Sequence, residues 1–365
     1  MKYRILGKQD LLDKKSFYQM MDENGKVISD NPPKLSLKNL IYAYKWIIRS
    51  RIQDEVMLKL QRQGRMLTFA PSMGEEALQV ATAMAMNKKK DVFCPGYRVN
   101  AALLEMGIPQ EQIMLYWAGN EMGSKIPKNV RTLPLNITIG CQYSHAAGVG
   151  YALKFKKTGG VAVAFIGNGG TSEGEFYEAM NIAAVHDWPV VFCVNNNQWA
   201  ISTPEVESTA AATIAAKAIA VGIPGMRLDG NDVLASYEGI EEALHHARTK
   251  GPVLVEFLTY RKGPHTTSDN PKIYRTAEME AKGEKLDPII RIKKYLLNDK
   301  RANWSAEKDE AVYEEARKMV QESYKKMEKQ LEVKVDDVFD YTYKELPDEL
   351  AEQKELCKKE NEEDV

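Results

Sequence analysis

The sequence predicts an α/β protein with a doubly wound, mostly parallel sheet flanked by helices. Between residues 91 and 258, short apolar runs of strand length alternate with helix-length segments, which is the pattern of strand–helix–strand units. The runs are apolar throughout, as parallel strands are when helices cover both faces of the sheet. After residue 287 the pattern becomes helical and charged. We expect an N-terminal arm (1–35), one α/β domain (36–287) and a helical C-terminal extension (288–365).

The first part of the chain is expected to be an arm followed by helices. Residues 1–35 carry turn signals and little periodicity. Ser36 is placed to cap a long helix that runs to about Gln63, because apolar residues recur along it at helical spacing. A second helix is expected to open within residues 70–77, and Asp91–Cys94 has the pattern of a short strand.

The clearest strand–turn–helix–strand unit runs from residue 161 to residue 203. Val161–Ile166 is a short apolar run that ends at a glycine-rich turn, and Val190–Val194 is the next strand. The residues between them have helical periodicity, with Thr171 and Ser172 placed to cap the helix. The glycines of the turn are expected to allow backbone angles or close approaches that a side chain would forbid, and they are Gly167, Gly169 and Gly170.

The other elements follow from the same patterns. A strand at Ile137–Gln142 and a helix at His145–Lys156 are expected before this unit. After it come an alanine-rich helix at Thr209–Ala220, a strand and a helix within 222–247, and a last parallel strand at Gly251–Leu258. The C-terminal extension is expected to hold helices at Ile289–Leu297, at Ser305–Leu331 and after Pro347, and to end in an acidic, solvated tail.

The composition argues against several classes of function. Fifty basic and 51 acidic residues leave a formal net charge of −1, which gives no support to nucleic-acid binding. No apolar run approaches the roughly 18 residues of a membrane-spanning helix, and the charged N-terminus lacks the apolar segment of a signal peptide. The cysteines are scattered, with no C-x-x-C pair. A reduced, cytoplasmic protein is therefore expected.

Polar groups are expected at the carboxyl edge of the sheet, where parallel sheets bind ligands. The helix N-terminus after the glycine turn suits a phosphate, and the amide oxygens of Asn168 and Asn197 suit Mg²⁺. The turn lacks the third glycine of a dinucleotide fingerprint and the lysine of a P-loop. On these residues alone, an ordinary strand–helix–strand unit with a tight turn remains open.

Two further segments contain candidate residues. Tyr97 and Arg98 follow the first predicted strand, and taken alone such a pair is usually a surface or cap feature. The long loop from Tyr260 to Arg275 is rich in Pro, Gly, Ser and Thr and contains His265. A solvent-exposed loop with an incidental histidine is one interpretation, but long loops at this edge of a sheet often close over a site. His145 is interpreted as an ordinary helical histidine rather than a pocket residue.

Several motifs together resemble the α subunit of the E1 component of 2-oxo acid dehydrogenases. The stretch from Gly167 to Asn197 is similar to the thiamine-diphosphate motif, which begins Gly-Asp-Gly and closes with Asn-Asn. The text GGTSEG within it and NNQWAISTP at its end match the E1 α pattern. So do RQGR and GEEA in the N-terminal third and GPHTTSDNPKIYR in the long loop. The resemblance covers nearly the whole chain from about Lys34 onward.

The resemblance implies a site for thiamine diphosphate and Mg²⁺. Tyr97 and Arg98 match contacts to the cofactor diphosphate, and Ile139 matches the residue that touches the aminopyrimidine ring. His265 matches the loop histidine near the reacting carbon and is the implied catalytic residue. The implied metal ligands are Asn168, Asn197 and the carbonyl of Trp199. The implied cofactor-binding set adds the glycine turn, Gly167, Gly169 and Gly170.

The activity implied by the resemblance is thiamine-diphosphate-dependent oxidative decarboxylation of a 2-oxo acid, with reductive acylation of the lipoyl group of an E2 core. Pyruvate is the favoured substrate, and branched-chain 2-oxoisovalerate is the alternative because those enzymes share the motifs. The chain after Arg275 is helical and charged, so it offers no second domain for the pyrimidine end of the cofactor. The implied partner is an E1 β subunit that carries the activating glutamate, in an α2β2 heterotetramer.

Asn168 departs from the family pattern, which has aspartate there. An amide keeps an oxygen for Mg²⁺ but removes a negative charge, so the protein alone should hold the metal less tightly. Two other classes of protein remain as alternatives. One is a non-catalytic assembly subunit of the same fold, and the other is an α/β protein that holds a different phosphate ligand at the glycine turn.

Overall fold

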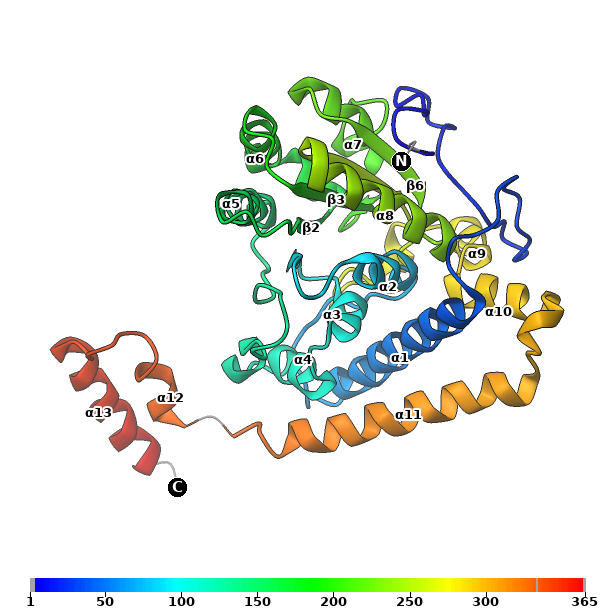
Figure 1. Cartoon of the computed structure of the whole chain (residues 1–365). Coiled ribbons are helices and arrows are strands. Elements are labelled where there is room, and N and C mark those ends of the chain that lie inside the picture. The colour runs from blue at the N-terminus through cyan, green and yellow to red at the C-terminus, as the bar shows by residue number, and fades with distance from the viewer. Residues whose placement is uncertain (1–3, 333, 364–365) are drawn as a thin grey trace.

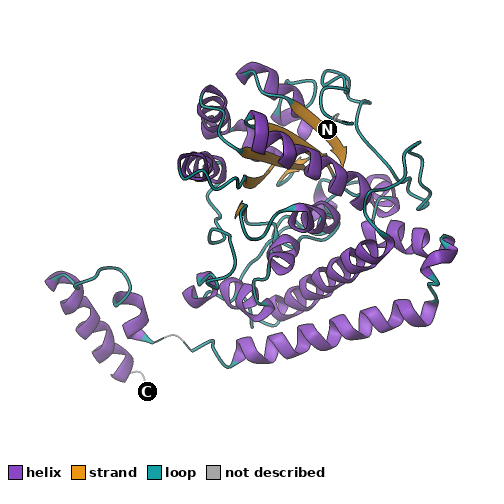
Figure 2. Ribbon diagram, viewed as in Figure 1, coloured by secondary structure: helices purple, strands orange, loops and turns teal. Residues whose placement is uncertain are grey.

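The computed structural model describes residues 4–332 and 334–363, which form a parallel sheet with helices on both faces (Figures 1 and 2). The five strands have the order β1-β2-β3-β7-β6, and each neighbouring pair is parallel. The strands are β1 (Val92–Cys94), β2 (Ala162–Gly167), β3 (Val190–Asn196), β6 (Gly225–Asp229) and β7 (Val253–Leu258). A short antiparallel pair, β4 (Trp199–Ala200) and β5 (Thr203–Pro204), follows β3. The predicted fold class is confirmed.

Six α-helices precede β3 in the described chain. They are α1 (Leu37–Arg62), α2 (Glu76–Ala85), α3 (Asn100–Met106), α4 (Gln110–Trp117), α5 (Cys141–Phe155) and α6 (Gly174–Val185). Of these, α5 packs against β1 and β2. The later helices are α7 (Glu205–Ser208), α8 (Val233–Lys250), α9 (Ala277–Lys285), α10 (Pro288–Asn298), α11 (Ala306–Glu328), α12 (Val335–Phe339) and α13 (Asp348–Glu363). Ser36 caps α1 as predicted, since its hydroxyl accepts from the N–H of Asn39 at 3.2 Å.

Alternate residues of the central strands belong to two different cores. In β2, Ala164 and Ile166 pack in the core under α5 and α6, whereas Val163 and Phe165 pack in the larger core on the other face. Successive side chains of a strand point to opposite faces, so a strand covered on both sides must be apolar at every position. This is why the apolar runs in the sequence identified the strands.

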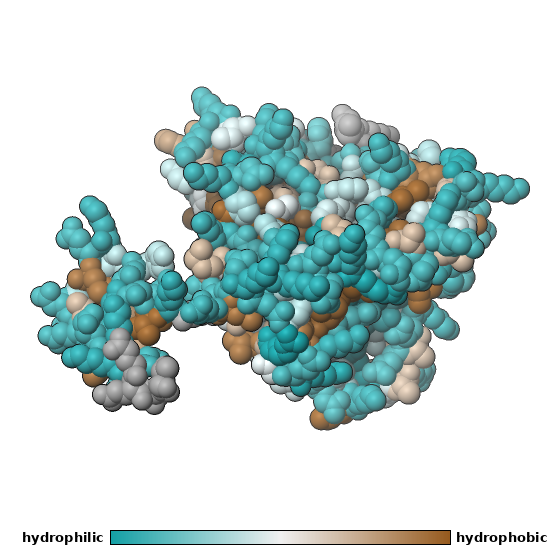
Figure 3. All heavy atoms as spheres, turned by 90° about the horizontal axis from the view of Figure 1, so that it is seen from below, coloured by the Kyte–Doolittle hydropathy of each residue, from teal (hydrophilic) through white to brown (hydrophobic). Residues whose placement is uncertain are grey.

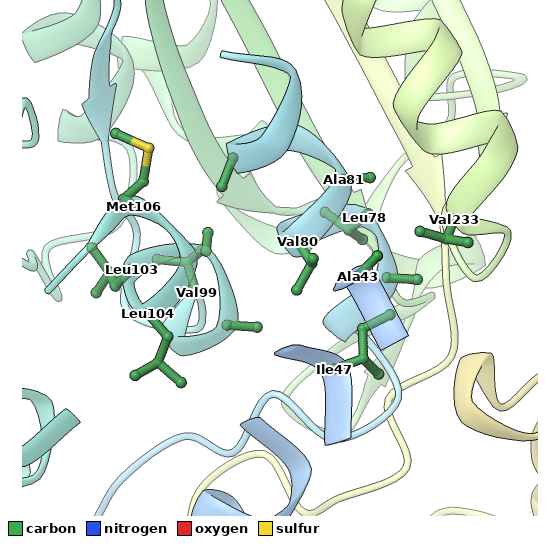
Figure 4. Packing of buried hydrophobic residues seen from close by; sticks show 14 of the residues in the cluster. Ala43, Ile47, Leu78, Val80, Ala81, Val99, Leu103, Leu104, Met106 and Val233 are labelled. Atoms are coloured by element: carbon green, nitrogen blue, oxygen red, sulfur yellow. The ribbon is translucent and has the colours of Figure 1, made fainter. Parts of the chain in front are cut away.

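The larger core is formed mainly by helices that pack on one another beyond the sheet. Figure 4 shows Ala43 and Ile47 of α1 close to Leu78 and Val80 of α2, with side chains of α3 beside them. Val233, at the start of α8, lies against the same cluster. The contacts with α1, α3 and α8 hold α2, and the turn that precedes α2, beneath the carboxyl edge of the sheet.

Two predicted elements differ from the structure. Residues 137–140 form no strand, since residues 138–140 are bends and α5 already begins at Cys141. The alternating Ile137 and Ile139 suggested a strand, but both are exposed, and Gly140 has a φ of +95°, which turns the chain. The alanine-rich helix expected at Thr209–Ala220 is replaced by a 3-10 helix at Ala215–Val221.

Tertiary hydrogen bonds explain the second difference. The Thr213 hydroxyl donates to the carbonyl of Leu11 at 2.5 Å, and the N–H of Ala215 donates to the carboxylate of Glu256 at 2.9 Å. These bonds hold the preceding residues out of a helix in spite of their composition. Here the tertiary contacts override the helical propensity of an alanine-rich segment.

The helix after the glycine turn also starts later than predicted. A 3-10 turn, Asn168–Ser172, comes first, and α6 begins at Gly174. Thr171 is not a cap of α6, because its hydroxyl donates to the carbonyl of Asn168 at 2.8 Å and closes that turn. Ser172 is likewise inside the turn, and its hydroxyl donates to the carbonyl of Ser208 at 3.3 Å.

The two ends of the chain behave differently. The N-terminal arm is irregular, and buried carboxylates hold it. Asp232 accepts from the backbone N–H groups of Met20 and Met21 at 2.7 and 2.6 Å. The pair α12 and α13 stands away from the main body and forms a separate lobe when viewed from below (Figures 1 and 3). Within the described ranges, no helix is long and apolar enough to cross a membrane.

Candidate active site

The carboxyl edge of the sheet is hollowed into a cavity of about 490 Å³. Its walls come from the residues after β1, the glycine turn after β2, the polar end of β3 and the loop after β7. The site residues predicted from the sequence all line this cavity, and they are Tyr97, Arg98, Ile139, Gly167, Asn168, Gly169, Gly170, Asn197, Trp199 and His265. His145 lies on the exposed side of α5, outside the lining.

The cavity has an apolar wall and a polar end. The apolar residues include Val99, Trp117, Ile137, Ile139, Phe165 and Ile166. The polar end brings together the asparagines that follow β2 and close β3 with Arg98 and His265. Such a combination suits a ligand that has both aromatic rings and a charged group.

The three glycines of the turn are not equivalent. Their φ angles lie outside the left-handed region, so of the two predicted reasons for glycine only a close approach applies. A Cβ at Gly169 would lie 2.8 Å from Cβ of Ala200, and one at Gly170 would lie 3.2 Å from Ile139. At Gly167, no described atom lies within 4 Å of such a Cβ. The close approach of β4 to the turn therefore requires glycine at Gly169.

Two asparagine side chains face the polar end with different surroundings. Asn168 is 2% exposed, and within the described part of the chain neither polar atom of its side chain has a hydrogen-bond partner. A buried amide without partners is costly, and it indicates that a ligand completes the site. Asn197 is held on both sides, because its Nδ2 donates to Glu75 at 2.7 Å and its Oδ1 accepts from the N–H of Trp199 at 3.1 Å.

Glu75 lies behind these amides, and the sequence analysis did not assign it a role. It stands in the turn before α2, is fully buried, and also accepts a short hydrogen bond from Nδ2 of Asn195. Burial raises the pKa of Glu75, while nearby Arg98 and the hydrogen bond from Asn197 act in the opposite direction. The only signal in the sequence was a pair of glutamates in the GEEA turn.

Arg98 connects the turn before α2 to the long loop after β7. Its Nη1 donates to the carbonyl of Pro71 and its Nη2 to the carbonyl of His265, both at 2.6 Å. Its Nε lies 3.9 Å from Oε2 of Glu75. Arg98 is buried yet lines the cavity, so it provides a fixed positive charge at the polar end.

The imidazole of His265 lies against two guanidinium groups. Its Nδ1 is 3.1 Å from Nη2 of Arg98 and 3.3 Å from Nη1 of Arg261, and its ring meets that of Tyr97 edge to face. Burial and the charges of Arg98 and Arg261 lower the pKa of His265 to about 4. The ring is therefore neutral near pH 7.

Arg261 is a second residue that the sequence analysis missed, and it organises the long loop. Its Nη2 donates to the carbonyl of Ile201 at 2.8 Å and to the hydroxyl of Tyr274 at 2.7 Å. The Tyr274 hydroxyl in turn donates to Asp269 at 2.5 Å, and Asp269 accepts from the N–H of His265 at 2.7 Å. The loop is thus folded around His265 at the cavity, and the alternative of a solvent-exposed loop with an incidental histidine does not hold.

The donors at the polar end suit a hard cation only in combination with an anionic ligand. Among the described residues there is no cluster of three or more His, Cys, Asp or Glu side chains that could hold a metal ion. The donors on the strand ends are neutral oxygens, those of Asn168, Asn197 and the backbone, and the carboxylate of Glu173 also lines the cavity. Mg²⁺ accepts such oxygens but usually draws the remaining ligands from substrate phosphates and water.

These features define an α/β enzyme that binds a phosphate-bearing cofactor at the carboxyl edge of a parallel sheet. The model of the dehydrogenase E1 component family matches residues 44–336, and the chain belongs to that family. It is a 2-oxo acid dehydrogenase component, and the family implies dependence on thiamine diphosphate.

Curated relatives extend the match over nearly the whole chain. Proteins named pyruvate dehydrogenase E1 component subunit alpha are similar to it in three bacterial genera. The protein from Mycoplasma genitalium is 50% identical over 94% of this chain and 96% of its own length. That from Acholeplasma laidlawii is 46% identical over 93% and 98%, and that from Staphylococcus aureus is 39% identical over 96% and 94%.

Proposed function

We propose that this chain is the α subunit of a pyruvate dehydrogenase E1 component, which decarboxylates pyruvate and passes the acetyl group to a lipoyl group of an E2 core. Relatives with that printed name match more than nine-tenths of the chain. The single observation that carries the proposal is the cavity, because the predicted site residues from four distant segments meet there.

The polar end would hold the diphosphate and its cation. Arg98 and Tyr97 are the proposed diphosphate contacts, since a guanidinium fork can bind phosphate oxygens in two places. The unpartnered amide of Asn168 fits a cation ligand, as do the oxygens of Asn197 and the Trp199 carbonyl. Mg²⁺ is the proposed cation. The glycine turn lets the ligand approach the backbone.

The apolar wall would hold the cofactor rings. Ile139 lies at the mouth of the cavity, where its backbone and side chain can contact the aminopyrimidine. Thiamine diphosphate, when bound, supplies the thiazolium carbon at which the 2-oxo acid is decarboxylated. The apolar wall would limit the access of water to the bound cofactor on that side of the cavity.

His265 is the proposed catalytic residue. A guanidinium can only donate hydrogen bonds, so Nδ1 of His265 must accept from Arg98 and Arg261. The proton of the neutral ring is then on Nε2, which makes Nε2 a hydrogen-bond donor at neutral pH. This donor can orient a diphosphate or carboxylate oxygen without a change of charge on the ring.

The site is open on one side, and an E1 β subunit is proposed to complete it. The outer sides of α5 and α6, which pack beside each other, expose large apolar residues: Tyr151, Phe155, Ile182 and Val185. Ile137 and Ile139, just before α5, are also exposed. We call this surface, together with Gly148, the α5–α6 face. Figure 1 places α5 and α6 at the edge of the molecule, and a continuous apolar face is typical of a protein interface.

The proposal is tested by co-expressing this chain with its β partner and measuring decarboxylation of pyruvate and of 2-oxoisovalerate. Thiamine diphosphate and Mg²⁺ are supplied or removed with a chelator. Pyruvate is expected to be the better substrate, judged by kcat/KM. Preference for 2-oxoisovalerate would assign the chain to branched-chain oxidation. Turnover of neither substrate, with the cofactor bound, would make it an assembly subunit.

A further inference from the structure

We propose that Glu75 is a positioning residue of the cation site, which turns the oxygen of Asn197 toward the cation and supplies the negative charge that Asn168 lacks. The inference rests on the proposed function, because it takes the cation site as described above. Glu75 itself would not contact the cation. It would act through the two asparagines that stand between it and the cavity.

Glu75 fixes the orientation of two side-chain amides, those of Asn195 and Asn197. Glu75 accepts from Nδ2 of Asn197 at 2.7 Å and from Nδ2 of Asn195 through its other oxygen. Both oxygens of Glu75 accept hydrogen bonds and Arg98 lies beside them, as suits a carboxylate, so both asparagines turn their NH₂ groups toward it. The oxygen of Asn197 is then directed to the opposite side, where it also accepts from the N–H of Trp199. The oxygen of Asn195 accepts from the hydroxyl of Thr259 at 2.6 Å.

A neutral side chain of the same shape would not hold both asparagine amides in this orientation. With glutamine at position 75, one of the two contacts would place an NH₂ group against another NH₂ group. One asparagine would then have to rotate its amide. If Asn197 rotated, its NH₂ group would face the cation and its oxygen would be lost as a ligand. The carboxylate therefore fixes the functional orientation of Asn197, as outer groups commonly do at metal sites.

Glu75 also contributes negative charge near the proposed cation. The groups that line the polar end include Arg98 and three neutral asparagines, so a dication bound by those amides would meet neutral ligands and a positive charge. The cavity lining also contains one carboxylate, that of Glu173 in the turn before α6. Glu75 is fully buried, 3.9 Å from Nε of Arg98, and in contact with a proposed ligand. Its charge is poorly screened by solvent and offsets that of Arg98 next to the cation. The negative charge of Glu75, which lies outside the cavity lining, thus compensates for the carboxylate that is missing at position 168.

Binding of Mn²⁺, used as a probe for Mg²⁺, tests this in the complete α–β complex with thiamine diphosphate. The free ion is followed by electron paramagnetic resonance, so the measurement does not depend on turnover. Glu75→Gln is expected to weaken Mn²⁺ binding by about 10- to 100-fold, the range found for outer groups of metal sites. Glu75→Gln combined with Asn168→Asp is expected to recover most of the loss, because the charge returns as a direct ligand.

The matched control is Glu105→Gln. Glu105 is also a buried carboxylate, but it lies on α3 and accepts from Lys88 at 2.8 Å, outside the cavity lining. This variant should bind Mn²⁺ as the wild type does. Thermal melting and assembly with the β chain show whether each variant folds. If Glu75→Gln alone does not assemble, the double variant is compared with Asn168→Asp alone. Weaker Mn²⁺ binding by the double variant supports the role of Glu75, and equal binding overturns it.

Two failures are distinguishable. Wild-type complex that binds neither cofactor nor Mn²⁺ would refute the proposed function, and this inference with it. Wild-type complex that binds both, together with equal Mn²⁺ affinity in Glu75→Gln, would refute the role of Glu75 and leave the proposed function standing.

Discussion

Nδ1 of His265 lies 3.1 Å from Nη2 of Arg98, and the same guanidinium nitrogen donates to the carbonyl of His265 at 2.6 Å. One arginine from the segment after β1 therefore holds both the ring and the backbone of the loop histidine. This contact joins two parts of the cavity that are 167 residues apart in the chain. It also keeps the ring neutral, because a second positive charge there would be repelled.

The stability of the chain should depend on the protonation of His265. Its pKa is lowered from 6.5 to about 4, so between these pH values the unfolded chain binds a proton that the folded chain does not. Acidification through this window therefore lowers the free energy of unfolding. His265→Gln should flatten this part of the pH dependence, measured by urea unfolding at several pH values. An unchanged slope would contradict the neutral histidine.

Arg261 should control the order of the long loop. Arg261→Lys removes the planar fork that bonds Ile201 and Tyr274. Loss of a charged hydrogen bond costs about 1.5–3 kcal/mol, so amide exchange in residues 264–270 should rise by about 10- to 100-fold. Hydrogen exchange with mass spectrometry measures this. Lys272→Arg, an exposed change in the same loop, is the control, and equal protection in both variants would count against the role of Arg261.

The glycine turn offers a matched pair of substitutions. Gly169→Ala places a Cβ 2.8 Å from that of Ala200, so β4 must move, and overpacking of this kind costs about 1–3 kcal/mol. Gly167→Ala meets no described atom within 4 Å and should leave the stability nearly unchanged. Denaturant unfolding compares the two. Equal losses of stability would show that the close approach at Gly169 is not limiting.

Gly148 allows stability and assembly to be separated. It is an exposed residue within α5, and no described atom lies within 4 Å of a Cβ built there. Replacing a helical glycine by alanine adds roughly 0.5–1 kcal/mol of stability, so the free chain should melt higher as Gly148→Ala. A partner helix that packs closely on the α5–α6 face would be displaced by a larger side chain. Gly148→Leu should therefore weaken binding of the β chain, while Gly148→Ala should weaken it less.

Analytical ultracentrifugation of α–β mixtures measures the second effect. Unchanged assembly with leucine at this position would place the interface elsewhere on the molecule. A lower melting temperature of the free chain would instead indicate that Gly148 has a structural role within the subunit.

The fold could be predicted from the sequence because the patterns that indicate strands and helices lie within short stretches of the chain. The strands β2, β3 and β7 are buried on both faces, so their continuous apolar runs identified them. The cap at Ser36 was equally visible. The strand expected at Ile137–Gln142 failed because two isoleucines that line an open cavity produce the same alternation as a half-buried strand.

The cavity residues were predicted from motifs, whereas their supporting groups were not. Asn168 and Asn197 stand at the ends of strands, where the topology brings them together. Glu75 accepts hydrogen bonds from two asparagines that lie 120 and 122 positions away in the chain. Arg261 donates to the carbonyl of Ile201, which lies 60 positions away. Such partners depend on how the turn before α2 packs under the sheet, and no local pattern in the sequence contains that information.

The α5–α6 face has a consequence for how the chain is made. Before a partner covers them, Tyr151, Phe155, Ile182 and Val185 are in contact with water, and two free chains can meet through the same residues. The rate of such self-association rises with the concentration of unassembled chain. Synthesis of this polypeptide in excess of its proposed partner should therefore favour self-association, and matched synthesis of the two chains should limit it.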